Sequence, residues 1–484
     1  MGRLVLLGTL YISVQCSLAS ARIINVPSDY PTIQAGIDAS ANGDTVLVQP
    51  GTYYENVIIE EHAITLASLF LTTRDTSYIS TTVIDGDSLG SVIRFDNWLD
   101  SSSVLTGFTI TYGGGVYGGG GVHIQSSPKI SNNIIEDNSA TRGGGIYSTG
   151  SPHIIDNIIR NNHVTVAGGG IVSYGGALTA ERNRITDNSS DTYGGGIHFE
   201  NSQIATIKNN LILRNSAEYD GGGVIFHTED AGGNLTGNVI AENQANVHSG
   251  VGFCGGVYEL TNNTICSNSY TEFGLEIGEY CQANLVNNII WNNATLEILV
   301  DSLALAIVTY CDIQGGFEGQ GNINADPSLR NPEHDDFRLM AIACGNPYDS
   351  PCIDAGHPDI LDSLLDCDWG LGTTRSDMGA YGGRDSEIVG ISEPELPSQF
   401  TVSQNYPNPF NPATTIRYEL PHFADVTLEI YDILGRKVAT LVSGQQQPGH
   451  HRVVWDAAEY HSGIYFYRLK AEDFVETKKM LLLK

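Results

Sequence analysis

The chain has 484 residues, of which 55 are glycine, 41% are hydrophobic and only 16% are charged. These apolar residues suffice to build a core, which excludes a disordered chain, and the glycine content favours turn-rich β structure over helical bundles. The net charge is −31, and such an acidic chain repels phosphate backbones, which excludes nucleic acid as a partner.

Residues 1–21 have the features of a secretory signal peptide. Arg3 supplies a positive start, Leu4–Val14 supplies an apolar stretch, and Ala19-Ser20-Ala21 is a small-residue cleavage site. The apolar stretch is too short to span a bilayer, and no later stretch is long and apolar enough to do so. We therefore expect an exported chain whose mature form has no transmembrane segment.

The first element after the signal is predicted to be a short amphipathic helix over residues 31–43. Pro31 suits the first helical turn, and Gly43 suits the position after the last turn. A stack of parallel strands leaves its first edge unpaired, and we expect this helix to cover that edge.

The following segment contains an internal repeat, which is the strongest signal in the sequence. The pattern N-x-I-x-x-N occurs seven times, and its central isoleucines are 24 to 28 residues apart. The isoleucines are Ile135, Ile159, Ile185, Ile212, Ile240, Ile265 and Ile290. A second marker runs in phase with the first, three glycines followed by Ile or Val, at Gly119–Val122, Gly143–Ile146, Gly168–Ile171, Gly194–Ile197 and Gly221–Val224.

This repeat predicts a solenoid of parallel strands over residues 22–345. A period of about 25 residues suits one coil of three short strands and three turns, and successive coils stack about 4.8 Å apart. An isoleucine at the same place in every coil forms an internal apolar column, while the asparagines form a ladder that satisfies turn backbone groups.

Two stretches resemble pectate-lyase-like, right-handed parallel β-helix proteins. The segment from Ile33 to Val57 is similar to their N-terminal cap, and the repeated Gly-Gly-Gly-Ile-Tyr and Ser-Pro-x-Ile-x-x-Asn phrases are similar to their coils. Ser350–Gly356, followed by Ser376–Tyr381, resembles the C-terminal capping segment of surface-anchored members, placed here at 346–383. The resemblance implies an all-β, right-handed parallel β-helix, but this superfamily mixes enzymes with non-enzymes.

One column of residues predicts a glycan-binding surface. If Ile146 and its equivalents point inward, the next residue in each coil points outward, which places His123, Tyr147, Val172, His198 and Ile225 on one face. Tyr193 and Tyr219 precede glycine runs and would flank that column. Aromatic rings above a shallow groove suit stacking against sugars. The candidate glycan-binding residues are therefore His123, Tyr147, Tyr193, His198 and Tyr219.

No complete catalytic motif is present. Gly51-x-Tyr53-x-Glu55 is similar to the opening of pectin methylesterases, but their later catalytic segments have no counterpart, and the motifs of polygalacturonases are absent. Three hypotheses stay open: a surface adhesin or glycan-binding module, a polysaccharide lyase or hydrolase, and a structural surface protein. An enzyme predicts a cleft with carboxylates beside a basic group, whereas a binding module predicts an aromatic strip without that cluster.

The capping segment holds two further candidate sites. Its clustered carboxylates are hard oxygen ligands of the kind that Ca²⁺ prefers, so Asp354, Asp366, Asp368 and Asp377 are candidate calcium ligands. An exported chain meets oxidising conditions, and three cysteines that lie close in sequence are the candidates for a disulfide: Cys344, Cys352 and Cys367.

Residues 384–397 are predicted to be a linker, and residues 398–484 predict a small β-sandwich of about seven strands. The stretches Asn405–Pro421, Ile430–Val438 and Thr477–Lys484 resemble the type A C-terminal sorting domain of the type IX secretion system. The resemblance implies export across the outer membrane, the secretion machinery as a partner, and a secreted or surface-anchored protein. The residues that carry it are Asn405, Pro407, Asn408, Pro409, Gly435, Gly463, Lys478 and Lys479.

Overall fold

The computed structural model describes residues 21–484 except 97–101, 116–117, 202–203, 228–231, 271–272, 294, 368–369, 384–398, 406, 422–423, 447–448 and 473. The predicted linker and nearly all of the predicted signal peptide therefore lie outside the described residues. The chain forms two compact units that divide between Ser392 and Glu393. In the described part of the chain, no helix has the length and apolar character needed to cross a membrane.

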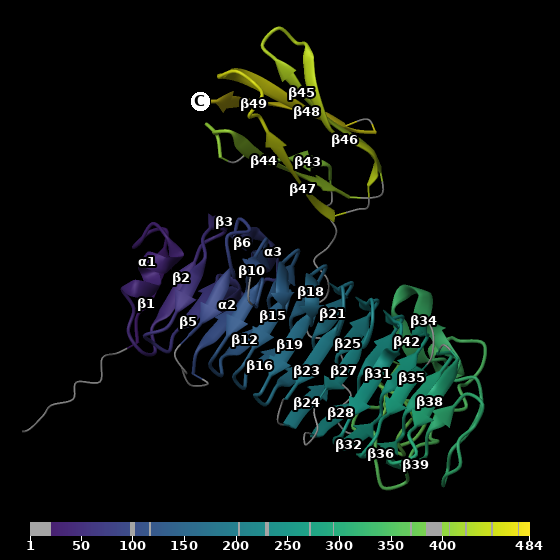
Figure 1. Cartoon of the computed structure of the whole chain (residues 1–484). Coiled ribbons are helices and arrows are strands. Elements are labelled where there is room, and N and C mark those ends of the chain that lie inside the picture. The colour runs from purple at the N-terminus through teal and green to yellow at the C-terminus, as the bar shows by residue number, and fades with distance from the viewer. Residues whose placement is uncertain are drawn as a thin grey trace, which may run out of the picture. The chain divides into compact units, whose positions relative to one another are not determined.

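The first unit is a solenoid of parallel β-strands (Figure 1). Its strands form three long sheets, which we call sheets A, B and C. Sheet A contains β1 (Ile23–Val26), β2 (Thr45–Val48), β5 (Thr65–Ser68), β8 (Val104–Thr106), β12 (Lys129–Ser131), β16 (His153–Ile155), β20 (Thr179–Glu181), β24 (Ile204–Lys208), β28 (Gly232–Thr236), β32 (Gly256–Thr261), β36 (Cys281–Val286) and β39 (Leu305–Thr309).

Sheets B and C run beside sheet A along the stack. Sheet B contains β3 (Gly51–Tyr54), β6 (Thr82–Asp85), β9 (Thr109–Thr111), β13 (Ile134–Glu136), β17 (Ile158–Arg160), β21 (Arg184–Thr186), β25 (Leu211–Leu213), β29 (Val239–Ala241), β33 (Thr264–Cys266), β37 (Ile289–Trp291) and β40 (Asp312–Ile313). Sheet C contains β4 (Val57–Ile59), β7 (Ile93–Phe95), β11 (Val122–Ile124), β15 (Ile146–Ser148), β19 (Ile171–Tyr174), β23 (Ile197–Glu200), β27 (Val224–His227), β31 (His248–Cys254), β35 (Phe273–Ile277) and β38 (Leu296–Val300).

A fourth sheet, sheet D, corrects the prediction of three strands per coil. It contains β10 (Gly114–Gly115), β14 (Ser139–Arg142), β18 (His163–Ala167), β22 (Ser189–Ser190), β26 (Ser216–Ala217), β30 (Gln244–Ala245) and β34 (Ser269–Tyr270). Most of these strands have only two residues, drawn from Ser, Ala, Gly, Gln and Tyr, so they lack the β-branched pattern that marks a strand in a sequence. They occupy the corner between sheets B and C.

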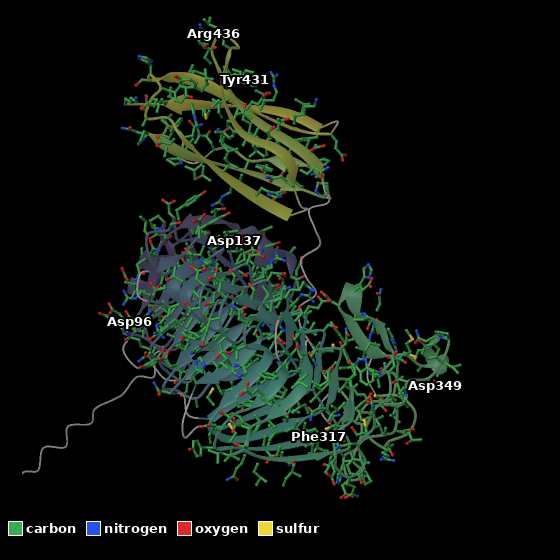
Figure 2. All side chains as sticks on the ribbon, turned by 45° about the vertical axis from the view of Figure 1, so that its right-hand side comes forward. Asp96, Asp137, Phe317, Asp349, Tyr431 and Arg436 are labelled. Atoms are coloured by element: carbon green, nitrogen blue, oxygen red, sulfur yellow. A yellow bond between two sulfur atoms is a disulfide. The ribbon has the colours of Figure 1, made fainter. Side chains whose placement is uncertain are left out.

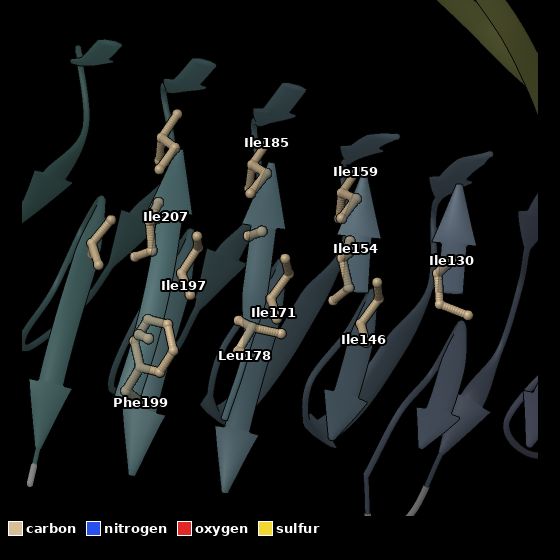
Figure 3. Close-up of a cluster of buried hydrophobic side chains, with 14 of the residues drawn as sticks. Ile130, Ile146, Ile154, Ile159, Ile171, Leu178, Ile185, Ile197, Phe199 and Ile207 are labelled. Atoms are coloured by element: carbon tan, nitrogen blue, oxygen red, sulfur yellow. The ribbon is translucent and has the colours of Figure 1, made fainter. Parts of the chain in front are cut away.

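The core is the predicted column of aliphatic side chains. Ile135, Ile159 and Ile185 are fully buried and pair in register along sheet B, as Ile146 and Ile171 do along sheet C. Figure 3 shows Ile159 and Ile185 on one sheet and Ile146 and Ile171 on another, all pointing into the space between the sheets. The isoleucines recur once per coil in the sequence, and this spacing correctly predicted that they stack on one another.

Two ladders of buried asparagines run along the corners of the coils. The Nδ2 of Asn210 donates to Asn238 Oδ1 at 3.0 Å, and its Oδ1 accepts from Asn183 Nδ2 at 3.0 Å. The second asparagine of each repeat makes the same bonds one corner later, as between Asn215 and Asn243 at 3.0 Å. Because each amide also bonds backbone groups, the ladders satisfy polar groups that the turns would otherwise bury unpaired.

The two ends of the solenoid are covered differently. Helix α1 (Ile33–Asp38) covers the first coils, with Thr32 as its N-cap, and is shorter than predicted. Helices α2 (Phe70–Thr73) and α3 (Ser77–Thr81) pack on the outside of sheet B. At the far end Phe317, labelled in Figure 2, packs against the core.

The capping segment lies along the flank of the coils, whereas the sequence predicted a cap at the end of the stack. The residues just before it, 329–344, contain β41 (Leu329–Asn331), β42 (Asp336–Leu339) and two 3₁₀ turns, Pro332–His334 and Ile342–Cys344. Phe337 and Ala380 pack on Leu211 and Val239, which point outward from sheet B. Without this cover the outward-pointing aliphatic side chains of sheet B would be exposed to water, so their burial favours this place for the segment.

The second unit is a sandwich of two antiparallel sheets, as predicted. One sheet contains β43 (Thr401–Val402), β44 (Ala413–Leu420) and β47 (Gly449–Asp456). The other contains β46 (Lys437–Gln446), β45 (Ala424–Asp432), β48 (Gly463–Ala471) and β49 (Phe474–Leu482). Alternate residues point inward, so that Ile416, Leu428 and Tyr467 meet in the core.

Candidate functional site

The predicted outer column on sheet C has the expected register but not the expected exposure. His123 pairs with Tyr147, Tyr147 with Val172, Val172 with His198, and His198 with Ile225. Val172 and Ile225 are nevertheless fully buried, and His198 is only 2% exposed. The prediction that this column forms an open surface is therefore wrong over the coils from Val172 to Ile225.

The glycine runs explain this burial. Gly194 has a φ of +63°, and a Cβ at that position would lie 2.5 Å from His198 Cβ. A Cβ at Gly221, where φ is +76°, would lie 2.5 Å from Ile225 Cβ. Only glycine permits this left-handed backbone and this close approach together, so the chain entering sheet C folds over the column and covers it.

His123 and Tyr147 lie apart from the other candidates. Their ring centroids are 5.1 Å apart, and His123 Nδ1 lies 3.1 Å from the carbonyl oxygen of Gly118. Val172 separates them from His198 in the column. The structure therefore divides the five predicted glycan-binding residues into a pair, His123 and Tyr147, and a second group that lines a cleft.

The cleft, which we call the His198 cleft, has a volume of about 450 Å³. Three of its lining residues, Tyr193, His198 and Tyr219, were predicted from the sequence. Sequence reasoning missed four others that supply most of its charge: Arg142, Glu200, Asp220 and His227.

Two further columns bring the missed residues to the cleft. Arg142, Ala167, Tyr193 and Asp220 each precede a glycine run, and they pair across successive coils at the corner between sheets D and C. Glu200 and His227 pair in register at the end of sheet C. The sequence contained one signal for these missed residues. Polar side chains recur four positions before and three positions after the inward-pointing Ile or Val of a coil.

The aromatic side chains form an edge-to-face cluster at the cleft. The Tyr193 ring centroid lies 5.6 Å from that of Tyr219 and 5.4 Å from that of His227, both nearly perpendicular. The rings of His198 and His227 are 5.0 Å apart. Tyr219 is 54% exposed, so this cluster presents a ring to the solvent while Tyr193 closes one wall.

The charged groups are paired with one another, both within a coil and across coils. Arg142 forms an ion pair with Glu200, and His227 Nε2 lies 3.1 Å from Asp220 Oδ2. His248, which is 6% exposed, contacts Asp220 through Nδ1 and lies 2.5 Å from Glu276 Oε2 through Nε2. A continuous chain of acid and imidazole groups therefore runs from His227 in the cleft to Glu276 behind it.

These contacts shift the protonation of the groups in opposite directions. Burial alone would raise the pKa of Asp220, but hydrogen bonds with His227 and His248 hold that pKa well below its usual range. Burial opposes the charge on His248, yet the bonds to Asp220 and Glu276 raise the pKa of His248 to about 9. Burial, with the neighbouring His227 and Arg142, lowers the pKa of His198 to about 3.

The predicted calcium ligands do not converge. Asp377 accepts from the backbone N–H groups of Asp354 and Leu371, both at 2.7 Å, and Asp354 accepts from Thr373. Asp366 lies near the turn at Gly370, and Asp368 is outside the described residues. Within the described ranges, no group of three or more His, Cys, Asp or Glu side chains is placed to hold a metal ion.

Of the three cysteines predicted to form a disulfide, Cys344 and Cys367 are bonded to each other. Cys352 is a buried free thiol whose Sγ lies 3.2 Å from Asp312 Oδ2. Their closeness in sequence did not decide between the pairings.

The sorting-domain residues hold the ends of the sandwich strands. Asn405 donates its backbone N–H to Tyr467 Oη at 2.8 Å and its Nδ2 to Thr414 Oγ1 at 2.9 Å. Asn408, between Pro407 and Pro409, accepts from Leu481 N at 2.9 Å. Gly435, with a φ of +75°, turns the chain between β45 and β46, and Gly463 begins β48. Lys478 pairs with Glu476, and the backbone of Lys479 accepts from Gln404.

Comparisons with known proteins agree with this architecture. Residues 97–265 match the family model described as right handed beta helix region, and residues 404–483 match secretion system C-terminal sorting domain. A search of curated proteins found no match. Among solved structures, DFA-IIIase from Arthrobacter chlorophenolicus A6 in complex with GF2 is similar at 13% identity, covering 63% of this chain and 98% of its own, with a TM-score of 0.35. The sorting domain indicates export by the type IX secretion system to the cell surface or extracellular space.

Proposed function

We propose that this chain, a right-handed parallel β-helix protein with a type IX secretion sorting domain, binds extracellular polysaccharide through the His198 cleft and acts as a surface adhesin or glycan-binding module. The observation that carries the proposal is the aromatic cluster of Tyr193, Tyr219 and His227 at the wall of that cleft. Exposed rings beside hydrogen-bonding groups suit the flat apolar face and the polar edge of a sugar.

The polar groups of the cleft support the same proposal. The carboxylates of Glu200 and Asp220 are held by Arg142, His227 and His248. Groups fixed in this way are already oriented before a ligand arrives, which lowers the entropy cost of binding. A polysaccharide hydroxyl that contacts such a carboxylate gains a charge-assisted hydrogen bond.

A second candidate function is cleavage of the bound polysaccharide by a lyase or hydrolase. A cleft with carboxylates beside a basic group favours an enzyme, and Glu200, Asp220, Arg142 and His227 form such a group in the His198 cleft. Because Arg142 is already paired with Glu200 and His227 with Asp220, binding without cleavage stays the first proposal. The pairing of His227 with an ionised Asp220 would orient the imidazole as a base. A purely structural surface protein requires neither the rings nor these charges.

The two functions are distinguished by one screen. The purified chain is applied to an array of plant, algal and microbial oligosaccharides, with and without Ca²⁺, and the same sugars are assayed for new reducing or unsaturated ends. Binding without turnover supports the adhesin, and new chain ends establish the enzyme. The absence of both binding and turnover across the array would leave a structural role.

A further inference from the structure

His198 is a buried polar side chain without a hydrogen-bond partner in the described part of the chain. It is 2% exposed, and neither Nδ1 nor Nε2 forms a hydrogen bond. Its nearest carboxylate oxygen, Glu200 Oε2, is 3.9 Å from Nε2, beyond hydrogen-bond distance. A buried donor and acceptor left unpaired reduce the stability of the fold, so this imidazole has an unfavourable position unless something else bonds it.

The architecture itself does not require a histidine there. The equivalent residues one coil before and one coil after are Val172 and Ile225, and both are fully buried. An apolar side chain would continue this column without an unpaired polar atom. The packing of the coils therefore does not explain why this residue is a histidine. Its place in the lining of the His198 cleft does explain it, because a ligand in the cleft can bond the imidazole.

The charges around His198 indicate what kind of ligand it bonds. Burial lowers the pKa of His198 to about 3, so at neutral pH the ring offers one N–H donor and one nitrogen acceptor and carries no charge. The guanidinium of Arg142 is already paired with Glu200. The segment 22–383 has 13 Lys and Arg against 42 Asp and Glu, and this excess of negative charge repels an anionic chain.

A sugar hydroxyl matches these properties. It donates and accepts at one atom, so it can satisfy either nitrogen of an uncharged imidazole. The rings of Tyr193 and His227 flank His198, with centroids 6.3 Å and 5.0 Å away. A pyranose that stacks on these rings would direct its hydroxyl edge toward the imidazole.

We propose that His198 determines the specificity of this cleft, and that its ligand is an uncharged sugar unit of a neutral polysaccharide, one of whose hydroxyl groups bonds Nε2, the ring nitrogen that lies toward Glu200. The proposal rests on the glycan binding proposed above and adds the substrate class and the residue that selects it. Uronate polymers are excluded because the cleft offers them no unpaired cation among its described residues.

The first experiment separates binding from packing by means of one substitution. In His198→Phe the imidazole is replaced by a ring of similar size without polar atoms. We expect the unfolding temperature of the full chain to equal or exceed that of the wild type, while affinity for neutral oligosaccharide falls at least about tenfold. His227→Phe is the matched control, because it removes a partner of Asp220 and should lower the unfolding temperature.

The probes are neutral gluco-, manno-, galacto- and xylo-hexaoses, beside oligogalacturonate and oligoalginate, titrated by calorimetry. Neutral binding that is lost in His198→Phe and partly kept in His198→Asn, which retains a donor and an acceptor, supports the proposal. Neutral binding unchanged in His198→Phe, a lower unfolding temperature of that variant, or tighter binding of uronates would each overturn it and leave glycan binding in place. If no oligosaccharide binds the wild type, the proposed function fails together with this inference.

Discussion

His227 Nε2 lies 3.1 Å from Asp220 Oδ2, although the two residues come from different columns of the solenoid. Asp220 sits at the corner before the glycine run, and His227 ends the strand that follows it. The column of buried residues that includes His198 and Ile225 lies between the two columns, and the contact spans it. This contact therefore ties the corner to the end of the strand, and both residues line the His198 cleft.

Removal of the Tyr193 ring should weaken glycan binding. Tyr193 contacts the rings of Tyr219, His198 and His227, so Tyr193→Ala disrupts the whole cluster. We expect a loss of about 1–1.5 kcal/mol in binding free energy, near tenfold in Kd. Calorimetric titration measures it, with Tyr280→Ala as the control, because Tyr280 is 72% exposed and lies outside the cleft lining. Equal affinity in the two variants would argue against the aromatic wall.

The stability of the solenoid should fall at alkaline pH because of His248. Its pKa is raised from an ordinary 6.5 to about 9 in the folded chain, so the folded state binds this proton more tightly than the unfolded state. The stabilisation is complete below about pH 6.5 and is lost as pH rises through about 9, on the order of 3 kcal/mol.

The measurement is urea unfolding at intervals between pH 6 and pH 10 for the wild type and for His248→Gln. The stability difference between the two proteins should shrink steadily over this window. A difference that stays constant would show that His248 is not held as the imidazolium between Asp220 and Glu276.

An alanine in the middle of an asparagine ladder should destabilise the fold strongly. Asn210 is fully buried, accepts from the backbone N–H and the Nδ2 of Asn183, and donates to Asn238. Asn210→Ala leaves these groups unpaired, and we expect a cost of about 3 kcal/mol in the free energy of unfolding. Gln282→Ala, at an exposed strand position, is the control and should change stability by less than about 0.5 kcal/mol.

The cysteines should differ sharply in reactivity. Cys254 is an exposed thiol, whereas Cys266, Cys281, Cys311 and Cys352 are buried. In the chain without residues 1–21, iodoacetamide should therefore add one label in the native state and five after unfolding without reductant, as counted by mass spectrometry. Reduction should break the Cys344–Cys367 disulfide, which joins residues 23 positions apart. The free energy of unfolding should then fall by about 3 kcal/mol. Labelling of Cys344 or Cys367 before reduction would contradict that pairing.

Removal of the sorting domain should stop export at the periplasm. In a host with type IX secretion, a chain that ends at Gly383 should accumulate in the periplasm, while the full chain reaches the cell surface. Immunoblots of periplasmic and surface fractions measure this, and full-length Tyr280→Ala controls for the handling of a variant. A truncated chain found at the surface would show that residues 404–483 are not needed for export.

The sequence by itself determined the parts of this protein that repeat. The fixed spacing of Ile135, Ile159 and their equivalents predicted the inward column, and the paired asparagines predicted the ladders, because each residue in a solenoid stacks on its equivalent in the next coil. The same rule predicted the register of His123, Tyr147 and His198. The C-terminal motifs predicted the sorting domain independently of any repeat.

Only the tertiary structure determined what happens between columns. Successive repeats differ in length by a few residues, and the extra residues lie at the corners, so the sequence did not show that the chain before Gly194 folds over His198. This path of the chain places three columns side by side: the corner residues before the glycine runs, the buried column of His198, and the strand ends. It therefore brings Arg142, Glu200, Asp220 and His227 together. The same limit applies to the disulfide: local spacing brought three cysteines near one another, and the path of the capping segment chose Cys344 and Cys367.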